Sequence, residues 1–302
     1  MKKVSKIITI IIIEDLLRLY TRTRPEIKLN TANQIIPSFI YGTAWKKEAT
    51  AHLVLQAISA GFVAIDTANQ IKHYDESLVG EALLSLFNQG IKRETLFLQT
   101  KFTPVNGQDH RTPYNASDNI TTQVEQSFNS SLKHLHTNYI DSYLLHGPYS
   151  GNGLIEEDWE AWKAIEGIYK SGKTKMIGVS NVNAEQLSLL CDRATIKPMT
   201  VQNRCYSSMG WDKEVRKICR DHNIVYQGFS LLTANQHTLM HPKIRAIANR
   251  LNTGPEQVIF RFAKQIGILP LTGTTNRQHM EEDLKSENLE ISMDETELIG
   301  TL

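Results

Sequence analysis

The chain has 302 residues, of which 41% are hydrophobic and 22% charged, and 33 basic side chains nearly balance 32 acidic ones for a net charge of +1. This is the composition of a globular protein with a sizeable core, and the length suits a single α/β barrel. The near-neutral charge, without a basic cluster interleaved with aromatic residues, argues against a nucleic-acid partner. Three cysteines without a CxxC spacing indicate a reducing compartment, so we expect a cytoplasmic protein.

The first 35 residues precede the repeating part of the sequence and form an extension of uncertain role. Three residues, Met1 to Lys3, and the isoleucine-rich run Ile7–Ile13 resemble the start of a signal peptide. The run is far shorter than the roughly 20 apolar residues that span a bilayer, and Glu14 and Asp15 end it. We expect a helical or strand-like extension over 1–35 and no membrane association, with a signal peptide as the weaker alternative.

From residue 36 to residue 302 one pattern repeats, a short β-branched apolar run followed by a stretch with helical spacing. The expected strands are Phe39–Tyr41, Val63–Ile65, Leu96–Gln99, Ile140–Leu145, Met176–Val179, Thr200–Gln202, Ile224–Phe229 and Ile268–Leu271. The expected helices include Ala49–Ala60, Leu78–Asn88, Thr121–Leu135, Glu157–Tyr169 and Ala184–Leu190. About eight such rounds, without a glycine-rich nucleotide fingerprint, predict an α/β fold with a single (β/α)8 TIM barrel over 36–302.

Ionisable side chains follow three neighbouring expected strands, at the end where such barrels carry their active sites. Asp66 follows the second strand, Lys101 the third and His146 the fourth, and Tyr74 lies in the loop after Asp66. A carbonyl that accepts hydride needs a proton donor, which a phenol can be when a nearby ammonium tunes its pKa, and an imidazole can orient the carbonyl. Each residue alone has a structural explanation, such as a helix cap for Asp66, but together they indicate proton-assisted hydride transfer.

The motifs around these residues occur in the order of a known family. They are GFVAIDTA, ESLVGEAL after Tyr74, LQTKF, NYIDSYLLHGP, IGVSN and KPMTVQN. The chain therefore resembles the aldo-keto reductases, and this implies reduction of aldehydes and ketones to alcohols by NAD(P)H, bound without a Rossmann fold. The resemblance also implies a catalytic tetrad of Asp66, Tyr74, Lys101 and His146, with Tyr74 as proton donor.

One register stays open at the tyrosine position. The interval from Asp66 to Tyr74 is three residues longer than is usual in the family, and counting back from Val79 places His73 there instead. Tyr74 is the stronger candidate, because an imidazole cannot replace a phenol in this chemistry without other changes.

The resemblance also assigns residues to the cofactor and the substrate. Expected at the nicotinamide, its ribose and the pyrophosphate are Gly42, Thr43, Ser180, Asn181, Gln202, Phe229, Ser230 and Leu231, with Trp45 in the substrate pocket. Expected at the adenosine end are Thr274, Thr275, Arg277, His279, Glu282 and Asp283.

The 2′-phosphate end departs from the family pattern. The lysine that binds this phosphate in NADPH-specific relatives is replaced by Gly273, so Arg277 and the backbone amides that open a helix over Asn276–Asp283 are expected to take its place. We expect NADPH to be preferred by about tenfold, with NADH also used.

The leading interpretation is a carbonyl reductase, and the alternative is a non-catalytic, cofactor-binding regulatory relative of the same fold. A metal-dependent barrel hydrolase is disfavoured and no metal is expected, because the pair His134 and His136 ends a helix rather than the first strand. The expected partner is a small carbonyl substrate, and the chain is expected to be a monomer or weak oligomer.

Overall fold

The computed structural model describes residues 27–28 and 35–302. The isoleucine-rich run and most of the predicted extension lie outside the described residues. The described part of the extension is a short antiparallel pair, β1 (Ile27–Lys28) with β2 (Ile35–Ile36). None of the helices in 27–28 and 35–302 combines the length and the hydropathy that a membrane crossing requires.

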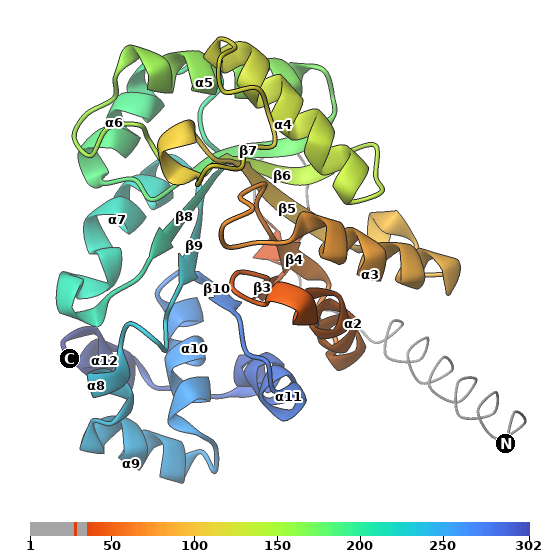
Figure 1. The fold of residues 1–302 in the computed structure, drawn as a ribbon. Helices are drawn as coiled ribbons and strands as arrows, with labels where there is room; N and C mark the ends of the chain where they lie inside the picture. Colours follow the sequence, from red (N-terminus) through yellow and green to blue (C-terminus); the bar gives the residue numbers. More distant parts are fainter. Residues whose placement is uncertain (1–26, 29–34) are drawn as a thin grey trace, which may run out of the picture.

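Eight parallel strands close into a barrel, as the strand–helix repeat predicts (Figure 1). They are β3 (Ile40–Gly42), β4 (Ala64–Asp66), β5 (Phe97–Phe102), β6 (Ile140–Leu145), β7 (Thr174–Ser180), β8 (Thr200–Arg204), β9 (Val225–Phe229) and β10 (Leu269–Thr272). The last strand, β10, pairs with both β9 and β3 and so closes the ring. The prediction of a (β/α)8 barrel is confirmed.

Helices follow the strands and form a ring around them (Figure 1). The described α-helices are α2 (Thr50–Ala60), α3 (Glu76–Asn88), α4 (Ile120–His134), α5 (Glu156–Lys170), α6 (Ala184–Arg193), α7 (Lys213–Asp221), α8 (Gln236–Leu239), α9 (Pro242–Arg250), α10 (Pro255–Gln265), α11 (Arg277–Lys285) and α12 (Met293–Gly300). Short 3-10 turns are η1 (Lys47–Ala49), η2 (Arg93–Thr95), η3 (Val105–Gly107), η4 (Ser207–Asp212) and η5 (Ser286–Asn288). Side-chain caps fix several helix starts: Asn183 accepts from the backbone N–H of Gln186, as its position before α6 predicts.

The side chains inside the barrel are apolar at the amino ends of the strands, which we call the apolar floor, and polar toward the carboxyl ends. One buried cluster gathers residues from six strands and from β2, namely Ile36, Ile40, Ala64, Phe97, Met176, Val225 and Leu269. Because strand side chains alternate between faces, positions two residues further along lie on the same inner face of the barrel. Asp66 stands two residues after Ala64, and Gln99 two after Phe97. The polar side chains of the barrel interior therefore rest on an apolar base.

The loop that carries Tyr74 is fixed by a polar cluster at the start of α3. The carboxylate of Glu76 is buried, and both of its oxygens accept from Ser131 Oγ of α4 at 3.0 Å. One of these oxygens also lies 3.1 Å from His134 Nδ1. Gly80 permits this close approach, since a Cβ there would lie 1.7 Å from the carbonyl oxygen of His134. These contacts bind the start of α3 to α4. They therefore also hold Tyr74, which precedes Glu76 by two residues, in place.

Candidate active site

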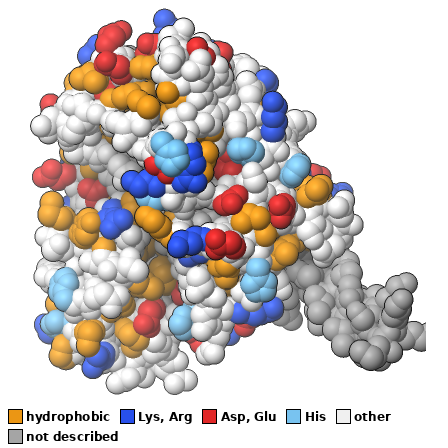
Figure 2. Space-filling model, in the orientation of Figure 1, with side chains coloured by type: hydrophobic (Ala, Val, Ile, Leu, Met, Phe, Trp, Pro, Cys, Tyr) orange, Lys and Arg blue, Asp and Glu red, His pale blue; other side chains and the backbone are white. Residues whose placement is uncertain are grey.

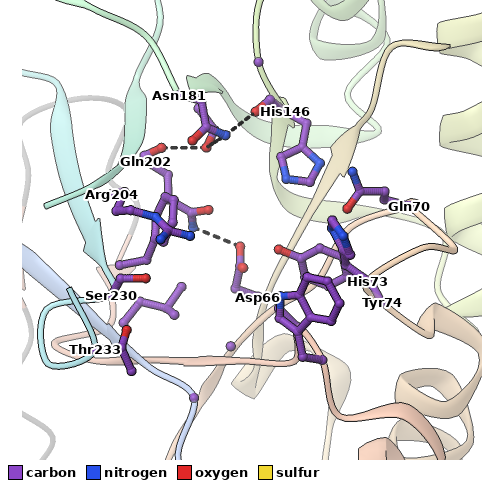
Figure 3. Close-up of a pocket in the computed structure, with 18 of the residues that line it drawn as sticks. Asp66, Gln70, His73, Tyr74, His146, Asn181, Gln202, Arg204, Ser230 and Thr233 are labelled. Atoms are coloured by element: carbon purple, nitrogen blue, oxygen red, sulfur yellow. Dashed lines mark hydrogen bonds between the residues drawn. The ribbon is translucent and has the colours of Figure 1, made fainter. Parts of the chain in front are cut away.

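A cavity of about 710 Å³ opens at the carboxyl ends of the barrel strands. The space-filling view in Figure 2 looks onto the barrel from the same side as Figure 1. Thr103, Asn106 and Gly107 of the long segment between β5 and α4 line the cavity, which places this loop at the carboxyl ends of the strands. Figure 3 shows Asp66, Tyr74 and His146 directed into the same space from different strands and loops.

Asp66 and Lys101 form a buried ion pair beneath the cavity. The Nζ of Lys101 lies 2.6 Å from Asp66 Oδ1 and donates to the carbonyl oxygen of Thr67 at 2.8 Å. Lys101 is fully buried and Asp66 is 3% exposed. Burial lowers the pKa of Lys101, whereas the carboxylate of Asp66 acts in the opposite direction. The pair thus places a cation close to the cavity without contact with bulk water.

Tyr74 lies next to this ion pair. Lys101 Nζ is 5.4 Å from the centroid of its ring, and the His146 ring makes an edge contact with it at 5.9 Å. The Tyr74 hydroxyl has no hydrogen-bond partner in the described part of the chain. Burial and, second, the carboxylate of Asp66 raise the pKa of Tyr74 well above its ordinary value. These two influences outweigh any lowering of this pKa by Lys101, so the phenol keeps its proton at neutral pH.

The two candidates for the tyrosine position have different neighbours. His73 stacks on Trp45 with ring centroids 3.9 Å apart, and its carbonyl oxygen accepts from the backbone N–H of Trp45 at 2.7 Å. Tyr74 instead contacts Lys101 and His146. Both side chains line the cavity, but of the two it is Tyr74 that meets the other predicted catalytic groups. Tyr74 is thus the candidate that lies beside both Lys101 and His146.

His146 lines the cavity and is held through one of its ring nitrogens. Its Nδ1 lies 2.6 Å from the hydroxyl oxygen of Thr103. Burial, assisted by the positive charge of Lys101, holds the pKa of His146 well below its usual range. The imidazole is therefore neutral at neutral pH, with Nδ1 engaged by Thr103 and one nitrogen left for a ligand.

A layer of three buried glutamines supports Asp66 from below. Gln99 and Gln202 each donate from Nε2 to Asp66 Oδ1, at 2.7 and 3.0 Å, and to Gln227 Oε1, at 2.7 and 2.9 Å. Both hydrogens of the Gln202 amide are therefore used, and its oxygen is left for the cavity, which Gln202 lines. Sequence reasoning found Gln202 but missed Gln99 and Gln227. Gln99 stands two residues before Lys101, and Gln227 two residues before Phe229. This spacing could have revealed them in the sequence, because it places them on the same inner face of the barrel as those residues.

The chain matches known proteins over most of its length. A model described as the aldo/keto reductase family matches residues 39–302. The chain belongs to the aldo/keto reductase family. An uncharacterized oxidoreductase of Bacillus subtilis, YtbE, is 32% identical over 250 residues, which cover 82% of this chain and 82% of that protein. The NADPH-dependent alpha-keto amide reductase of Saccharomyces cerevisiae is 29% identical over 297 residues, covering 91% of this chain and 89% of that protein.

Solved structures agree with this assignment. The crystal structure of an aldo/keto reductase from Brucella melitensis superposes with a TM-score of 0.78 at 26% identity and covers 92% of this chain and 99% of that one. Membership in the family makes the protein an NAD(P)H-dependent oxidoreductase. The resemblance read from the sequence motifs is thus confirmed.

Most side chains predicted near the nicotinamide of this aldo/keto reductase do lie at the cavity. The lining includes Gly42, Trp45, Ser180, Asn181, Gln202, Phe229, Ser230, Leu231 and Thr274. Thr43 is buried beside it, and its hydroxyl donates to the carbonyl oxygen of Asp66 at 2.9 Å. Ser180 Oγ donates to the carbonyl oxygen of Gln202 at 2.6 Å, and Asn181 Nδ2 donates to that of His146 at 2.8 Å. These bonds fix both side chains at the ends of neighbouring strands.

The residues predicted at the adenosine end are placed differently. Five of them do not line the cavity: Thr275, Arg277, His279, Glu282 and Asp283. The guanidinium of Arg277 pairs with Glu281 at 3.1 Å on the exposed face of α11. The carboxylate of Asp283 is buried and accepts from Thr272 Oγ1 at 2.9 Å, and burial raises its pKa to about 6. Arg277 and Asp283 are thus each bound to other protein groups.

The start of α11 is also less open to an anion than the sequence suggests. Asn276 Oδ1 accepts from the backbone N–H groups of Gln278 and His279, at 2.8 and 3.3 Å. The N–H of Asn276 itself donates to Thr274 Oγ1 at 3.2 Å. The expected amide site at this helix start is therefore largely satisfied by the protein's own side chains.

Two basic side chains that sequence reasoning missed lie at the mouth of the barrel. Arg204 at the end of β8 is the one Lys or Arg among the described residues that line the cavity, and its guanidinium is 5.5 Å from the Phe229 ring centroid. Figure 3 shows it on the side of Ser230, across the cavity from Tyr74. Lys46 Nζ donates to the carbonyl oxygen of Gly273. That contact joins residues 227 positions apart, so no local pattern could reveal it.

Proposed function

We propose that this aldo/keto reductase uses NADPH to reduce small aldehydes and ketones to alcohols, with Tyr74 as the proton donor. The observation that carries the proposal is the unbonded hydroxyl of Tyr74, which faces the cavity beside His146 and above the Asp66–Lys101 ion pair. The name of the yeast relative, an NADPH-dependent reductase of keto amides, supports the same reaction class.

The residues around the cavity fit NADPH. Gly42 lines the cavity at the end of β3, and its lack of a side chain lets Leu271 pack close to it, since a Cβ would lie 2.6 Å from Leu271 Cδ2. Phe229 offers an aromatic face to a nicotinamide ring, and Gln202 offers an amide oxygen to the N–H of its carboxamide. Arg204 supplies a positive charge beside Ser230 for the pyrophosphate. We propose that these residues hold the cofactor together with Thr43, Ser180, Asn181, Leu231 and Thr274.

When bound, NADPH supplies the hydride, and the protein supplies the proton. We propose the tautomer in which Thr103 donates to Nδ1 of the neutral His146, so that the ring proton is on Nε2 and binds the carbonyl oxygen of the substrate. Tyr74 donates its proton to the same oxygen as negative charge develops there. The ammonium of Lys101, held by Asp66, stabilises the phenolate that forms. Trp45, stacked on His73 at the rim, forms one wall of the substrate pocket.

A direct assay separates this proposal from a non-catalytic role. The purified chain should oxidise NADPH in the presence of small aldehydes, measured as loss of the absorbance of the reduced nicotinamide. The rate should persist in a chelator, since no group of three or more His, Cys, Asp or Glu in the described residues could hold a metal ion. NADPH binding without turnover across a broad aldehyde and ketone panel would instead support the regulatory relative.

The pH profile should lack a histidine titration near the ordinary value. Because burial holds the pKa of His146 well below its usual range, the ring is neutral and active throughout the interval around pH 6.5. We expect kcat/KM to stay within about twofold between pH 6 and pH 8 and to fall only at lower pH, where the ring becomes protonated. A fall centred near pH 6.5 that His146→Gln removes would contradict this assignment.

We propose that the catalytic unit is the barrel of residues 36–302 and that residues 1–35 are an extension outside it. The β1–β2 pair adjoins the apolar floor through Ile36, at the end of the barrel opposite the cavity. Removing residues 1–24, which leaves this pair intact, should therefore change kcat/KM by no more than about threefold. The measurement is steady-state kinetics beside a thermal melt. A folded truncated protein without activity would show that the extension contributes to the site.

A further inference from the structure

An ammonium group that lacks a counter-ion lies beside Gly273, a residue that lines the cavity. Lys46 belongs to the loop between β3 and α2, it is half-buried, and its Nζ donates to the carbonyl oxygen of Gly273. No carboxylate in the described residues pairs with it. Burial lowers the pKa of Lys46. A partly desolvated cation with one neutral partner favours binding of an anion.

The backbone of this loop is built to direct Lys46 toward β10. Trp45 and Lys47, on either side of it, have φ angles of 62° and 49°, the left-handed region that non-glycine residues enter at a cost of about 1 kcal/mol or more. Trp45 is held in this conformation by its stacking on His73 and by its backbone N–H bond to the same residue. The loop therefore holds Trp45 against His73, in the segment between β4 and α3, while Lys46 contacts the loop after β10.

The loop after β10 provides the other half of this site. A Cβ at Gly273 would lie 3.4 Å from Lys46 Nζ, so the glycine keeps space open beside the ammonium. Gly273 and Thr274 both line the cavity. Thr274 Oγ1 accepts from the N–H of Asn276 and so has its own hydrogen available for a ligand. An anion at this point meets a cation and a hydroxyl donor together.

We propose that Lys46 binds the 2′-phosphate of NADPH, so that a lysine from the first barrel loop provides the charge that glycine at position 273 lacks. This inference rests on the proposed function, because it places NADPH in the cavity. Lys46 contacts Gly273, in the loop that the family resemblance assigns to the adenosine end of the cofactor, whereas Arg204 lies beside Phe229 and Ser230. Arg277 is less suited to the role, because it pairs with Glu281 on the exposed face of α11.

Equilibrium binding, which needs no turnover, tests the inference. Calorimetric Kd values for NADPH, NADH and 2′,5′-ADP should be compared in the wild type and in Lys46→Met. Loss of a charged hydrogen bond to a phosphate should raise the Kd for NADPH and for 2′,5′-ADP by about tenfold to a hundredfold. The Kd for NADH should stay within about twofold, since NADH lacks the 2′-phosphate, and this also verifies that the variant is folded. Lys46→Arg should retain most of the affinity for NADPH.

Lys47→Met is the matched control, because it removes the same charge from the neighbouring, exposed residue. It should leave all three affinities unchanged at fixed ionic strength, as should Arg277→Ala. Equal weakening of NADPH and NADH in Lys46→Met would assign Lys46 to the pyrophosphate and overturn the inference. So would unchanged affinities in Lys46→Met, or loss of NADPH selectivity in Arg277→Ala alone. If the wild type binds neither dinucleotide, the proposed function itself fails.

Discussion

Replacing Tyr74 with phenylalanine should lower kcat/KM for a small aldehyde by a factor on the order of a hundred or more. The substitution removes one oxygen atom and keeps the ring that lies 5.4 Å from Lys101 Nζ and 5.9 Å from the His146 ring. The pocket should therefore keep its shape while losing its proton donor. Since the cofactor has its own set of contacts, its Kd should change by no more than about twofold. Steady-state kinetics and calorimetry measure the two quantities separately.

The effect of Tyr74→Phe should be compared with the effect of replacing His73, the other candidate for the proton donor. His73→Ala removes the ring that stacks on Trp45 and should alter KM for the substrate more than kcat. Tyr169→Phe on α5 makes the same chemical change as Tyr74→Phe at a residue away from the cavity, and it should leave the kinetics unchanged. If His73→Ala abolishes turnover and Tyr74→Phe does not, the register of this loop is wrong and His73 is the acid.

Replacing Lys101 with methionine should produce the second large effect, a loss in kcat on the order of a hundredfold. The ammonium that stabilises the phenolate would be absent, so the pKa of Tyr74 should rise further, and the basic limb of the pH profile should move to higher pH. The same change leaves the carboxylate of Asp66, which is 3% exposed, without its cation. Removal of one partner of a buried pair typically costs about 3 kcal/mol of folding free energy or more. Both the pH profile and denaturant unfolding should therefore be measured.

A double variant separates the catalytic effect from the effect on stability. Asp66→Asn combined with Lys101→Met removes both charges, so unfolding free energy should recover relative to Lys101→Met alone. Activity should not recover, because the phenolate still lacks a cation. Full activity and an unchanged pH profile in Lys101→Met would show that the lysine has only a structural role.

The barrel could be predicted from the sequence because its signals are local and repeated. Apolar runs of β-branched residues alternate with helical spacing, and each expected strand overlaps an observed one, with Ile140–Leu145 matching β6 at both ends. Several other strands end one to three residues later than expected, and the largest extension is in β5, which continues past Gln99 through Lys101 to Phe102. These extensions carry polar inward-facing residues, which a search for apolar runs leaves out of a strand.

The sequence predicted those site residues that stand at or just after the carboxyl end of a strand. Asp66, Lys101 and His146 each stand at such a position, and the structure brings them together with Tyr74. The phosphate end depends instead on contacts between distant loops. Whether Lys46 reaches Gly273, or Arg277 turns back onto its own helix toward Glu281, depends on side-chain geometry that residue spacing does not determine.

The three glutamines around Asp66 determine whether a ligand at the bottom of the cavity meets amide nitrogen or amide oxygen. An amide side chain can be turned end for end with almost no change in shape, so packing alone leaves its polarity undefined. An ionised Asp66 removes this freedom, because its oxygen only accepts, so nitrogen atoms of Gln99 and Gln202 must face it at 2.7 and 3.0 Å. Gln227 must then face both nitrogens with its oxygen. One negative charge thus sets the direction of every amide in the layer, and a neutral aspartic acid would release all three.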